Sequence, residues 1–252
     1  MSAPTHSNHS SLTLERALEL LTHGDIAPQG LLPWGSNYTF LVTVTLAEMQ
    51  TAAIYKPRDG ERPLWDFPDG TLCQREVAAF VVSQALDWFI VPPTVLRDGP
   101  NGVGMLQFYI DCDPEEHYFT LKEEGRFHEQ FKQIALFDLL INNADRKSGH
   151  CLRDANDHIW AIDHGVCFAV EPKLRTVIWD FAGQRIPDRW VTDLKKFRDQ
   201  LDRRDTPAAR ALVQLLDKRE LTAMKRRTEQ VLQTGCYPQP LPGYRQIPWP
   251  PV

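Results

Sequence analysis

This chain has 252 residues, and surface scaling predicts that a chain of this length buries about 70% of its accessible surface on folding. Such a chain can build a hydrophobic core without a structural metal or disulfide bonds. Its formal net charge of −5 argues against a dedicated nucleic-acid-binding protein, which normally carries a basic excess, but it allows a small phosphate-binding pocket.

The five cysteines are expected to be reduced thiols, because their number is odd and no pair has the spacing C-x-x-C. Reduced thiols favour a cytoplasmic location. No apolar run approaches the roughly 18 residues that a membrane-spanning helix needs, and residues 1–11 lack the pattern of a signal peptide. We therefore expect an unprocessed cytoplasmic protein without integral membrane contact. The cysteines are Cys73, Cys112, Cys151, Cys167 and Cys236.

The N-terminal half is predicted to be a small antiparallel sheet packed on one main helix. Strands are indicated by β-branched and aromatic residues in rough alternation, and helices by apolar residues at every third or fourth position. The predicted elements are a helix within 11–24, strands at 38–46 and 51–55, a loop at 58–70, a helix at 71–86 and a hairpin within 92–110.

The C-terminal half is predicted to be mostly helical. A helix from Phe127 is apolar on all sides, which is typical of a buried helix, and it leads directly into a polar loop. A short strand at 158–162 and two or three helices within 188–233 follow. The proline-rich residues 237–252 are either disordered or strapped along the surface.

These patterns predict an α+β fold with two lobes and a cleft between them. We expect an N-lobe at 1–110, which holds the sheet, the main helix and the nucleotide site. A C-lobe at 111–236 would hold the catalytic and metal loops, and 237–252 would be a tail.

Two aspartates, each in a short polar motif after an apolar segment, carry the clearest functional signal. Asp145 lies in Asn-Asn-Ala-Asp-Arg-Lys-Ser-Gly-His, and Asp163 lies in Ala-Ile-Asp-His-Gly. Metal-assisted phosphoryl transfer requires such a pair. One acid orients the attacking hydroxyl, and the other holds the cation that neutralises the phosphates.

Three features upstream complete this chemistry in a definite order. A turn at 35–37 offers backbone N–H groups and the Ser36 hydroxyl to phosphates. Lys56 follows at the end of a strand, and Glu76 on the next helix would hold its ammonium in place. Asp138, inside the apolar helix, would be unfavourable if unpaired, so we expect it to bond the backbone of the nearby catalytic loop.

Over residues 30–170 the chain resembles the protein-kinase-like superfamily, most closely its atypical phosphoinositide 3- and 4-kinase branch and the HipA-type bacterial kinases. The resemblance rests on Lys56 in Tyr-Lys-Pro, on Glu76, on Asp145 in Asn-Ala-Asp-Arg and on Asp163 in Ile-Asp-His-Gly. It also implies that His150, five residues after Asp145 and 13 before Asp163, is a second metal ligand. The implied activity is transfer of the γ-phosphate of ATP to a hydroxyl, with Mg²⁺ or Mn²⁺.

Two departures from the family pattern are visible. The glycine-rich G-x-G-x-x-G loop is missing, although the atypical branch also uses a serine-containing turn. His150 stands where kinases usually have asparagine, and because Mg²⁺ prefers oxygen ligands, an imidazole there predicts that activity tolerates or prefers Mn²⁺.

The predicted site residues fall into three groups. The catalytic residues are Asp145, Arg146 and Lys56. The nucleotide-binding residues are Ser36, Asn37, Lys56, Glu76, Gln107, Phe108 and Tyr109, the last three lying against the adenine. The metal ligands are His150 and Asp163.

Several other interpretations of the sequence stay open. The chain could be a pseudokinase that acts as a nucleotide-binding scaffold, a transferase that moves a nucleotidyl group, or a zinc-dependent interaction module. Residues 179–181 are either a substrate-facing activation segment or a local part of the core. The hydroxyl substrate could be a protein, a small molecule or a lipid, and no nucleic-acid partner is expected.

Overall fold

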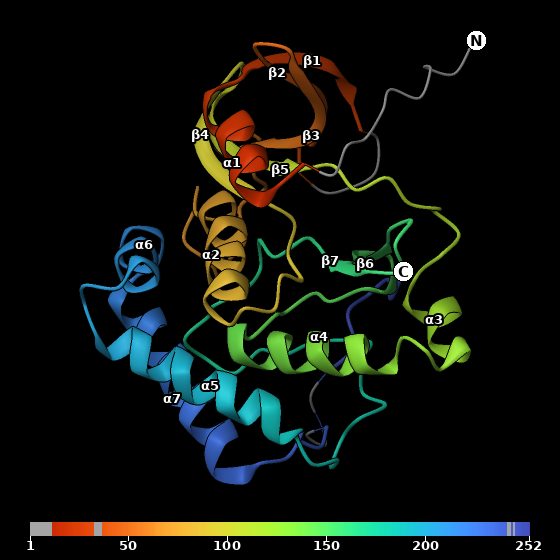
Figure 1. Cartoon of the computed structure of the whole chain (residues 1–252). Helices are drawn as coiled ribbons and strands as arrows, with labels where there is room; N and C mark the ends of the chain where they lie inside the picture. The colour runs from red at the N-terminus through yellow and green to blue at the C-terminus, as the bar shows by residue number, and fades with distance from the viewer. Residues whose placement is uncertain (1–11, 33–36, 241–242, 244) are drawn as a thin grey trace.

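A five-stranded antiparallel sheet forms the N-terminal part of the molecule, with the strand order β1-β2-β3-β5-β4 (Figure 1). The structure is a computed structural model that describes residues 12–32, 37–240, 243 and 245–252. The predicted strands and hairpin are confirmed. The strands are β1 (Asp25–Leu31), β2 (Phe40–Leu46), β3 (Met49–Pro57), β4 (Thr94–Gly99) and β5 (Gly102–Phe108).

Strand β1 was not predicted from the sequence. It contains Pro28 and Gly30, two residue types that are rare in strands, and its register with β2 shifts between them. Proline is tolerated here because β1 lies at the sheet edge and pairs with β2 alone. The helix that precedes it, α1 (Leu14–His23), begins after Thr13, whose hydroxyl accepts the N–H of Arg16 at 3.4 Å.

Helix α2 (Leu72–Ala85) lies below the sheet and joins it to the helical part of the molecule (Figure 1). Its first N–H groups, those of Leu72 and Cys73, donate to the carboxylate of Glu61 at 2.9 and 2.7 Å. On its buried side, Arg75 pairs with Glu220 of helix α7 (Lys218–Thr234). These contacts fix the helix at both its start and its flank, and they fix the direction of Glu76.

Helix α4 (His128–Ile141) is the centre of the C-terminal part and the main hydrophobic cluster surrounds it. It ends at Asn142, whose φ of 55° is a left-handed value that asparagine tolerates better than most residues. The Asn142 side chain donates to the carbonyls of Ala169 and Glu171 and accepts the N–H of Lys173. The exit from the helix into the predicted catalytic loop is therefore fixed by hydrogen bonds to a later segment.

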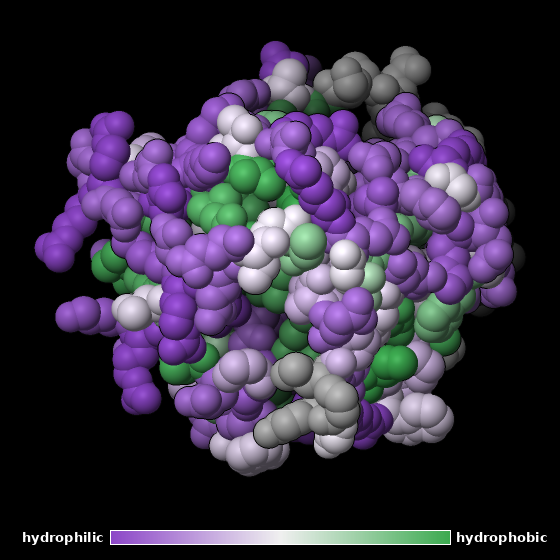
Figure 2. All heavy atoms as spheres, turned by 90° about the horizontal axis from the view of Figure 1, so that it is seen from below, coloured by the Kyte–Doolittle hydropathy of each residue, from purple (hydrophilic) through white to green (hydrophobic). Residues whose placement is uncertain are grey.

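The remaining elements flank α4 on several sides. The strand predicted at 158–162 is confirmed and pairs with a strand that was not predicted. The elements are α3 (Tyr118–Leu121), β6 (Cys151–Arg153), β7 (Ile159–Ala161), α5 (Asp188–Asp202) and α6 (Pro207–Leu215). Seen from below, this end of the molecule exposes mainly hydrophilic residues, with smaller apolar patches between them (Figure 2). No helix in the described part of the chain is both long and apolar enough to cross a bilayer.

The described part of the C-terminal tail, residues 245–252, packs back onto the molecule and ends beside β6 (Figure 1). The carbonyl of Pro251 accepts the N–H of Ser148 at 2.9 Å, just before β6. The carbonyl of Gln246 accepts the N–H of Thr176 at 2.9 Å and the indole N–H of Trp179 at 3.2 Å. Of the two alternatives for the tail, this part of it is strapped against the protein.

Ending the chain after residue 240 should lower its free energy of unfolding by about 1–3 kcal/mol for each buried N–H that loses its acceptor and stays without one. Ser148 and Thr176 carry the two backbone groups concerned. Urea denaturation measures the difference. The full chain with Ile247→Ala is the control, because it keeps both carbonyls and should match the wild type. Equal stability of the truncated and full chains would contradict this prediction.

Candidate active site

Lys56, Glu76 and Asp163 meet as predicted, although they come from three different elements. The Lys56 ammonium at the end of β3 donates to Glu76 Oε1 on α2 at 2.7 Å and to Asp163 Oδ1 at 2.8 Å. Asp163 follows β7 and has a φ of 61°, a strained value for a residue other than glycine that is often found at functional sites. The second Glu76 oxygen accepts the N–H of His164 at 2.7 Å, which ties α2 to the same turn.

Charge pairing sets the ionisation of Lys56 and Asp163. Burial alone would lower the pKa of Lys56, but the carboxylates of Asp163 and Glu76 outweigh it and raise that pKa above its usual value. The Lys56 ammonium in turn holds the pKa of Asp163 well below its usual range. Near neutral pH the site therefore presents a fixed ammonium and an ionised Asp163.

Asp145 lies on the loop after α4 and lines the same cavity. Its backbone N–H donates to the side-chain oxygen of Asn143 at 2.9 Å, and Lys147 lies 3.5 Å from its carboxylate. Burial raises the pKa of Asp145, and the nearby charge of Lys147 opposes that shift. A carboxylate with a raised pKa is a better proton acceptor than one in water.

Arg146 lies next to Asp145 but does not line the cavity, since the side chain is completely buried. Its guanidinium donates to both oxygens of Asp138, and further to the carbonyls of His150 and Ile162 at 3.0 and 2.8 Å. It also lies 2.7 Å from Nε2 of His164. Because all of these partners lie inside the protein, Arg146 holds the loop in place without reaching the cavity. The Asp138 carboxylate accepts from side chains of the loop, those of Arg146 and Asn143, and not from its backbone, so the partner predicted for Asp138 was wrong.

His150 lies behind Asp163, with its Nε2 3.3 Å from Asp163 Oδ2. Burial lowers the pKa of His150 to about 4, so the ring is neutral at neutral pH, the form that binds metals. The backbone N–H of Lys147 donates to Nδ1 at 3.3 Å, which leaves the ring proton on Nε2, facing Asp163. His150 can therefore become a metal ligand only if that proton moves.

Asp163 offers a divalent cation a carboxylate, and His150 would add a second donor only after its Nε2 proton moves. Such a set fits a cation that completes its shell with phosphate oxygens and water. Within residues 12–32, 37–240, 243 and 245–252, no group of three or more His, Cys, Asp or Glu side chains is arranged to hold a metal on its own. The residue types present suit a metal shared with a nucleotide, for which the carboxylate of Asp163 would be the main donor.

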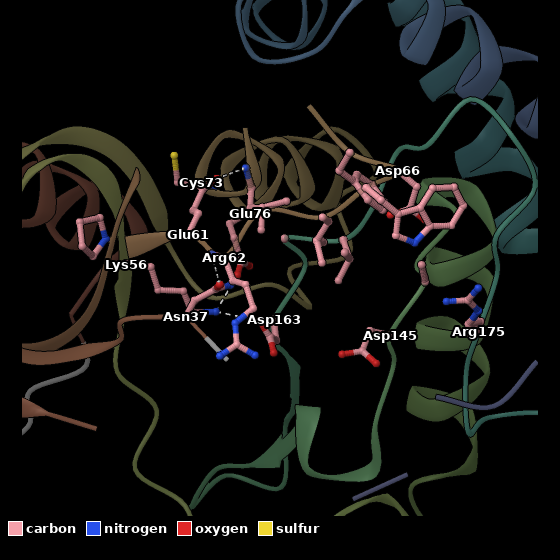
Figure 3. A pocket seen from close by; sticks show the side chains of 18 residues that line it. Asn37, Lys56, Glu61, Arg62, Asp66, Cys73, Glu76, Asp145, Asp163 and Arg175 are labelled. Atoms are coloured by element: carbon pink, nitrogen blue, oxygen red, sulfur yellow. Dashed lines mark hydrogen bonds and ion pairs between the residues drawn. The ribbon is translucent and has the colours of Figure 1, made fainter. Parts of the chain in front are cut away.

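Four of the charged residues described above, Lys56, Glu76, Asp145 and Asp163, line one cavity of about 290 Å³ (Figure 3). Lys56, Glu76 and Asp163 lie on one side of it, and Asp145 lies farther along. Asn37 also lines the cavity, and its side-chain oxygen accepts the N–H of Arg62 at 2.7 Å. Ser36, predicted for the same turn, lies outside the described residues.

The residues predicted to contact adenine do not line this cavity. Gln107 is on β5, where it pairs with Ile54 of β3, and its side chain is turned to Thr94 at 2.9 Å. The backbone N–H groups of Phe108 and Tyr109 donate to the carbonyls of Pro93 and Ala52. Gln107 and Phe108 lie on β5, the strand next to the one that carries Lys56, and Tyr109 follows directly after it.

The loop at 58–70 was predicted only as a connection, yet it supplies a whole wall of the cavity. Its lining residues are Glu61, Arg62, Leu64, Trp65, Asp66 and Phe67. Trp65 is 93% exposed, and an aromatic side chain so exposed in a proline-rich loop is the signal that the sequence offered. Arg175, from the segment after β7, lies at the end of the cavity where Asp66 also lies, and it was not predicted either (Figure 3).

The segment at 179–181 belongs to the core rather than to the cavity. Phe181 is 5% exposed within the main hydrophobic cluster, and Asp180 pairs with Lys122 at 3.1 Å. Of the two interpretations of this segment, the local core is the one that the structure supports.

The sheet, the helix that carries Glu76 and the helical C-terminal part give the chain a kinase-like α+β fold, with the site where these parts meet. No family model matches the chain. It belongs to the family of the Mycobacterium tuberculosis protein Rv2133c, with 38% identity over an alignment of 264 residues that covers 92% of this chain and 94% of that one.

Other similarities are more distant. A phosphatidylinositol 4-kinase gamma 4 from rice, Oryza sativa subsp. japonica, is 33% identical over 117 residues, which is 37% of this chain and 20% of that protein. The structure of hydra Fam20 with sugar shares the fold, with a TM-score of 0.56, 12% identity and 90% coverage of both chains. The Helicobacter pylori proinflammatory kinase CtkA aligns with 86% of this chain and 94% of that one, at 13% identity and a TM-score of 0.49.

Replacing Asp138 by alanine should destabilise the protein by about 3–5 kcal/mol, because the charge of Arg146 would remain buried without its counterion. Urea denaturation is the measurement. Asp199→Ala, which removes a surface carboxylate paired with Arg198, is the control and should leave the midpoint close to the wild-type value. A loss no larger than that of the control would mean that the buried pair does not hold the loop.

Proposed function

We propose that this protein is an ATP-dependent phosphotransferase that moves the γ-phosphate to a hydroxyl substrate. The observation that carries the proposal is that one cavity brings together the Lys56 ammonium, held between Glu76 and Asp163, and the Asp145 carboxylate. An ammonium and two acids around one hollow are the groups that phosphoryl transfer needs. The kinase-like fold and the partial similarity to a phosphatidylinositol 4-kinase support the same conclusion.

In this proposal the three charged groups have separate roles. Lys56 binds phosphate oxygens through charge-assisted hydrogen bonds, and Glu76 keeps its ammonium in place from a position that is 2% exposed. Asp145 accepts the hydroxyl proton of the substrate, for which its raised pKa is suited. Asp163, with His150 behind it, would hold Mg²⁺ or Mn²⁺, and the bound cation would neutralise charge on the phosphates.

The rest of the nucleotide would lie along the sheet. Ser36 and Asn37 would contact phosphates from the turn before β2, and the adenine would lie against the backbone of Gln107, Phe108 and Tyr109. The strand register supports this arrangement, because Lys56 on β3 pairs with Met105 on β5, the strand that also carries Gln107 and Phe108. It corresponds to an N-lobe of residues 1–110 above a C-lobe of residues 111–236, with the acceptor entering from the C-lobe side.

Asp145→Asn should lower turnover by about 10²–10⁴-fold while leaving nucleotide affinity nearly unchanged, because it removes a proton acceptor and not a phosphate ligand. Lys56→Met should lower both turnover and nucleotide affinity. Formation of ADP from ATP measures turnover with any acceptor, and thermal shift with a non-hydrolysable ATP analogue measures binding. Asp199→Asn and Lys195→Met, on the surface of α5, are the matched controls.

Each other result has a definite meaning. Normal turnover by Asp145→Asn contradicts the assigned mechanism. Nucleotide binding without any turnover by the wild type would make the protein a nucleotide-binding scaffold. Transfer of label from the α-phosphate instead of the γ-phosphate would make it a nucleotidyl transferase.

His150→Asn should shift the preferred metal from Mn²⁺ toward Mg²⁺, because an amide oxygen replaces an imidazole nitrogen beside Asp163. Titration of activity with each metal, in the wild type and the variant, tests this expectation. His158→Asn is the matched control, since His158 contacts the carbonyl of Phe89. An unchanged metal preference in His150→Asn would mean that His150 serves only as a hydrogen-bond donor to Asp163.

A further inference from the structure

The cavity extends from Lys56 toward the start of α2 and not along β5. Its lining includes Leu72 and Cys73 of the first turn of α2, but none of the strand residues expected beside the adenine. Figure 3 shows Asp66 and Arg175 at the end away from Lys56, and the lining further includes Leu64, Trp65, Phe67 and Val166. This second half of the cavity has no role in the binding of a nucleotide along the sheet.

The carboxylates that line the cavity already have partners. Glu61 accepts the first N–H groups of α2, and Asp66 pairs with Lys173. The remaining three are Glu76 and Asp163 with Lys56, and Asp145 with Lys147. Every acidic side chain on the wall is thus engaged within the protein.

The arginines on the wall are different. Among the described residues, no carboxylate or other hydrogen-bonding group contacts the guanidinium of Arg62 or that of Arg175, although both line the cavity. Figure 3 shows Arg62 beside Asn37 and Asp163, and Arg175 beyond Asp145 on the side away from Lys56. One free cation therefore lies near the expected phosphates, and the other lies near the expected acceptor.

The backbone of Arg175 is held rigidly beside Asp145. Its N–H donates to the carbonyl of Asn143 at 2.9 Å, and its carbonyl accepts the N–H of Arg146 at 3.0 Å. The two bonds bracket Asp145 in the catalytic loop. The backbone from which the Arg175 side chain extends therefore has a fixed position relative to the proposed proton acceptor.

Apolar groups complete this half of the cavity. Leu64, Trp65, Phe67 and Val166 line it, and Lys173 lies over the rings of Trp65 and Phe67 at 5.2 and 5.1 Å from their centroids. A volume of about 290 Å³ for the whole cavity limits the acceptor to a small molecule or the end group of a larger one.

We propose that this half of the cavity binds the acceptor, and that the acceptor carries a phosphate or carboxylate close to its reactive hydroxyl, held by Arg175. The inference rests on the proposed phosphotransfer. In that reaction the acceptor oxygen bonds to the γ-phosphorus, and the bond from that phosphorus to the bridging oxygen breaks. The nucleoside diphosphate leaves with the electron pair, and the hydroxyl proton passes to Asp145.

The test uses inorganic phosphate as the probe, in the presence of a saturating non-hydrolysable ATP analogue. The wild type should bind phosphate in addition to the analogue, as measured by calorimetry. Arg175→Gln should bind it at least about tenfold more weakly, since a charge-assisted hydrogen bond is lost, while its affinity for the analogue stays the same. Arg185→Gln, which changes an exposed arginine, is the matched control.

The possible results separate this inference from the proposed function. Phosphate binding that is absent in the wild type, or equal in Arg175→Gln, overturns the acceptor site. A parallel loss of analogue affinity in Arg175→Gln also overturns it, because Arg175 would then belong to the nucleotide site. Failure of the wild type to bind the analogue refutes the proposed function instead, whatever the phosphate result.

Matched acceptors then identify the source of the anion. Glycerol 3-phosphate should raise the formation of ADP from ATP more than glycerol does, and Arg175→Gln should remove the difference. Soluble glycerophosphoinositol, compared with phosphatidylcholine vesicles that contain phosphatidylinositol, distinguishes a free anion from a lipid headgroup. If glycerol raises turnover as much as glycerol 3-phosphate does, the proposed anionic acceptor is contradicted.

Discussion

The buried guanidinium of Arg146 holds together the parts of the chain on which the site depends. It joins helix α4 through Asp138, the loop before β6 through the carbonyl of His150, and the turn after β7 through Ile162 and His164. An ion pair removed from water gains little net stability, but either charge alone would be strongly unfavourable. The main effect of the pair is therefore to favour one arrangement of these segments, because any packing that separates them leaves a buried charge without a partner.

Asp163 connects this buried framework to the reactive surface of the site. In the structure its two oxygens are engaged by Lys56 and His150, so both already have a partner within the protein. A divalent cation would compete with the Lys56 ammonium for the same carboxylate. Lys56 would then be available to bind phosphate oxygens while Glu76 still holds its ammonium. The same lysine can thus stabilise the empty site and bind the nucleotide.

The sequence was sufficient to predict that four charged residues meet in one site, and less so for the residues around them. Lys56, Glu76, Asp145 and Asp163 could be found because each follows or lies within a regular element whose pattern is clear. Arg146 was expected to be catalytic from its place beside Asp145, but neighbouring residues in a loop can face opposite ways, and only the fold determines which side is buried. Strand β1 was missed because its proline and glycine suit only a sheet edge, which is a property of the tertiary structure. The loop wall with Trp65 was missed because irregular segments have no periodic pattern.

The catalytic loop is irregular, yet its backbone is ordered by an alternation that resembles a strand. The N–H groups of Ala144, Arg146 and Ser148 donate to Val166, Arg175 and Pro251, which come from three separate segments. The residues between them, Asp145 and Lys147, have their N–H groups engaged by side chains of the loop itself. Because every second residue is bonded to the body of the protein, Asp145 has a fixed position without belonging to a helix or sheet. A loop held in this way can keep a carboxylate partly desolvated beside Arg175, and this explains how the distant tail contributes to the geometry of the site.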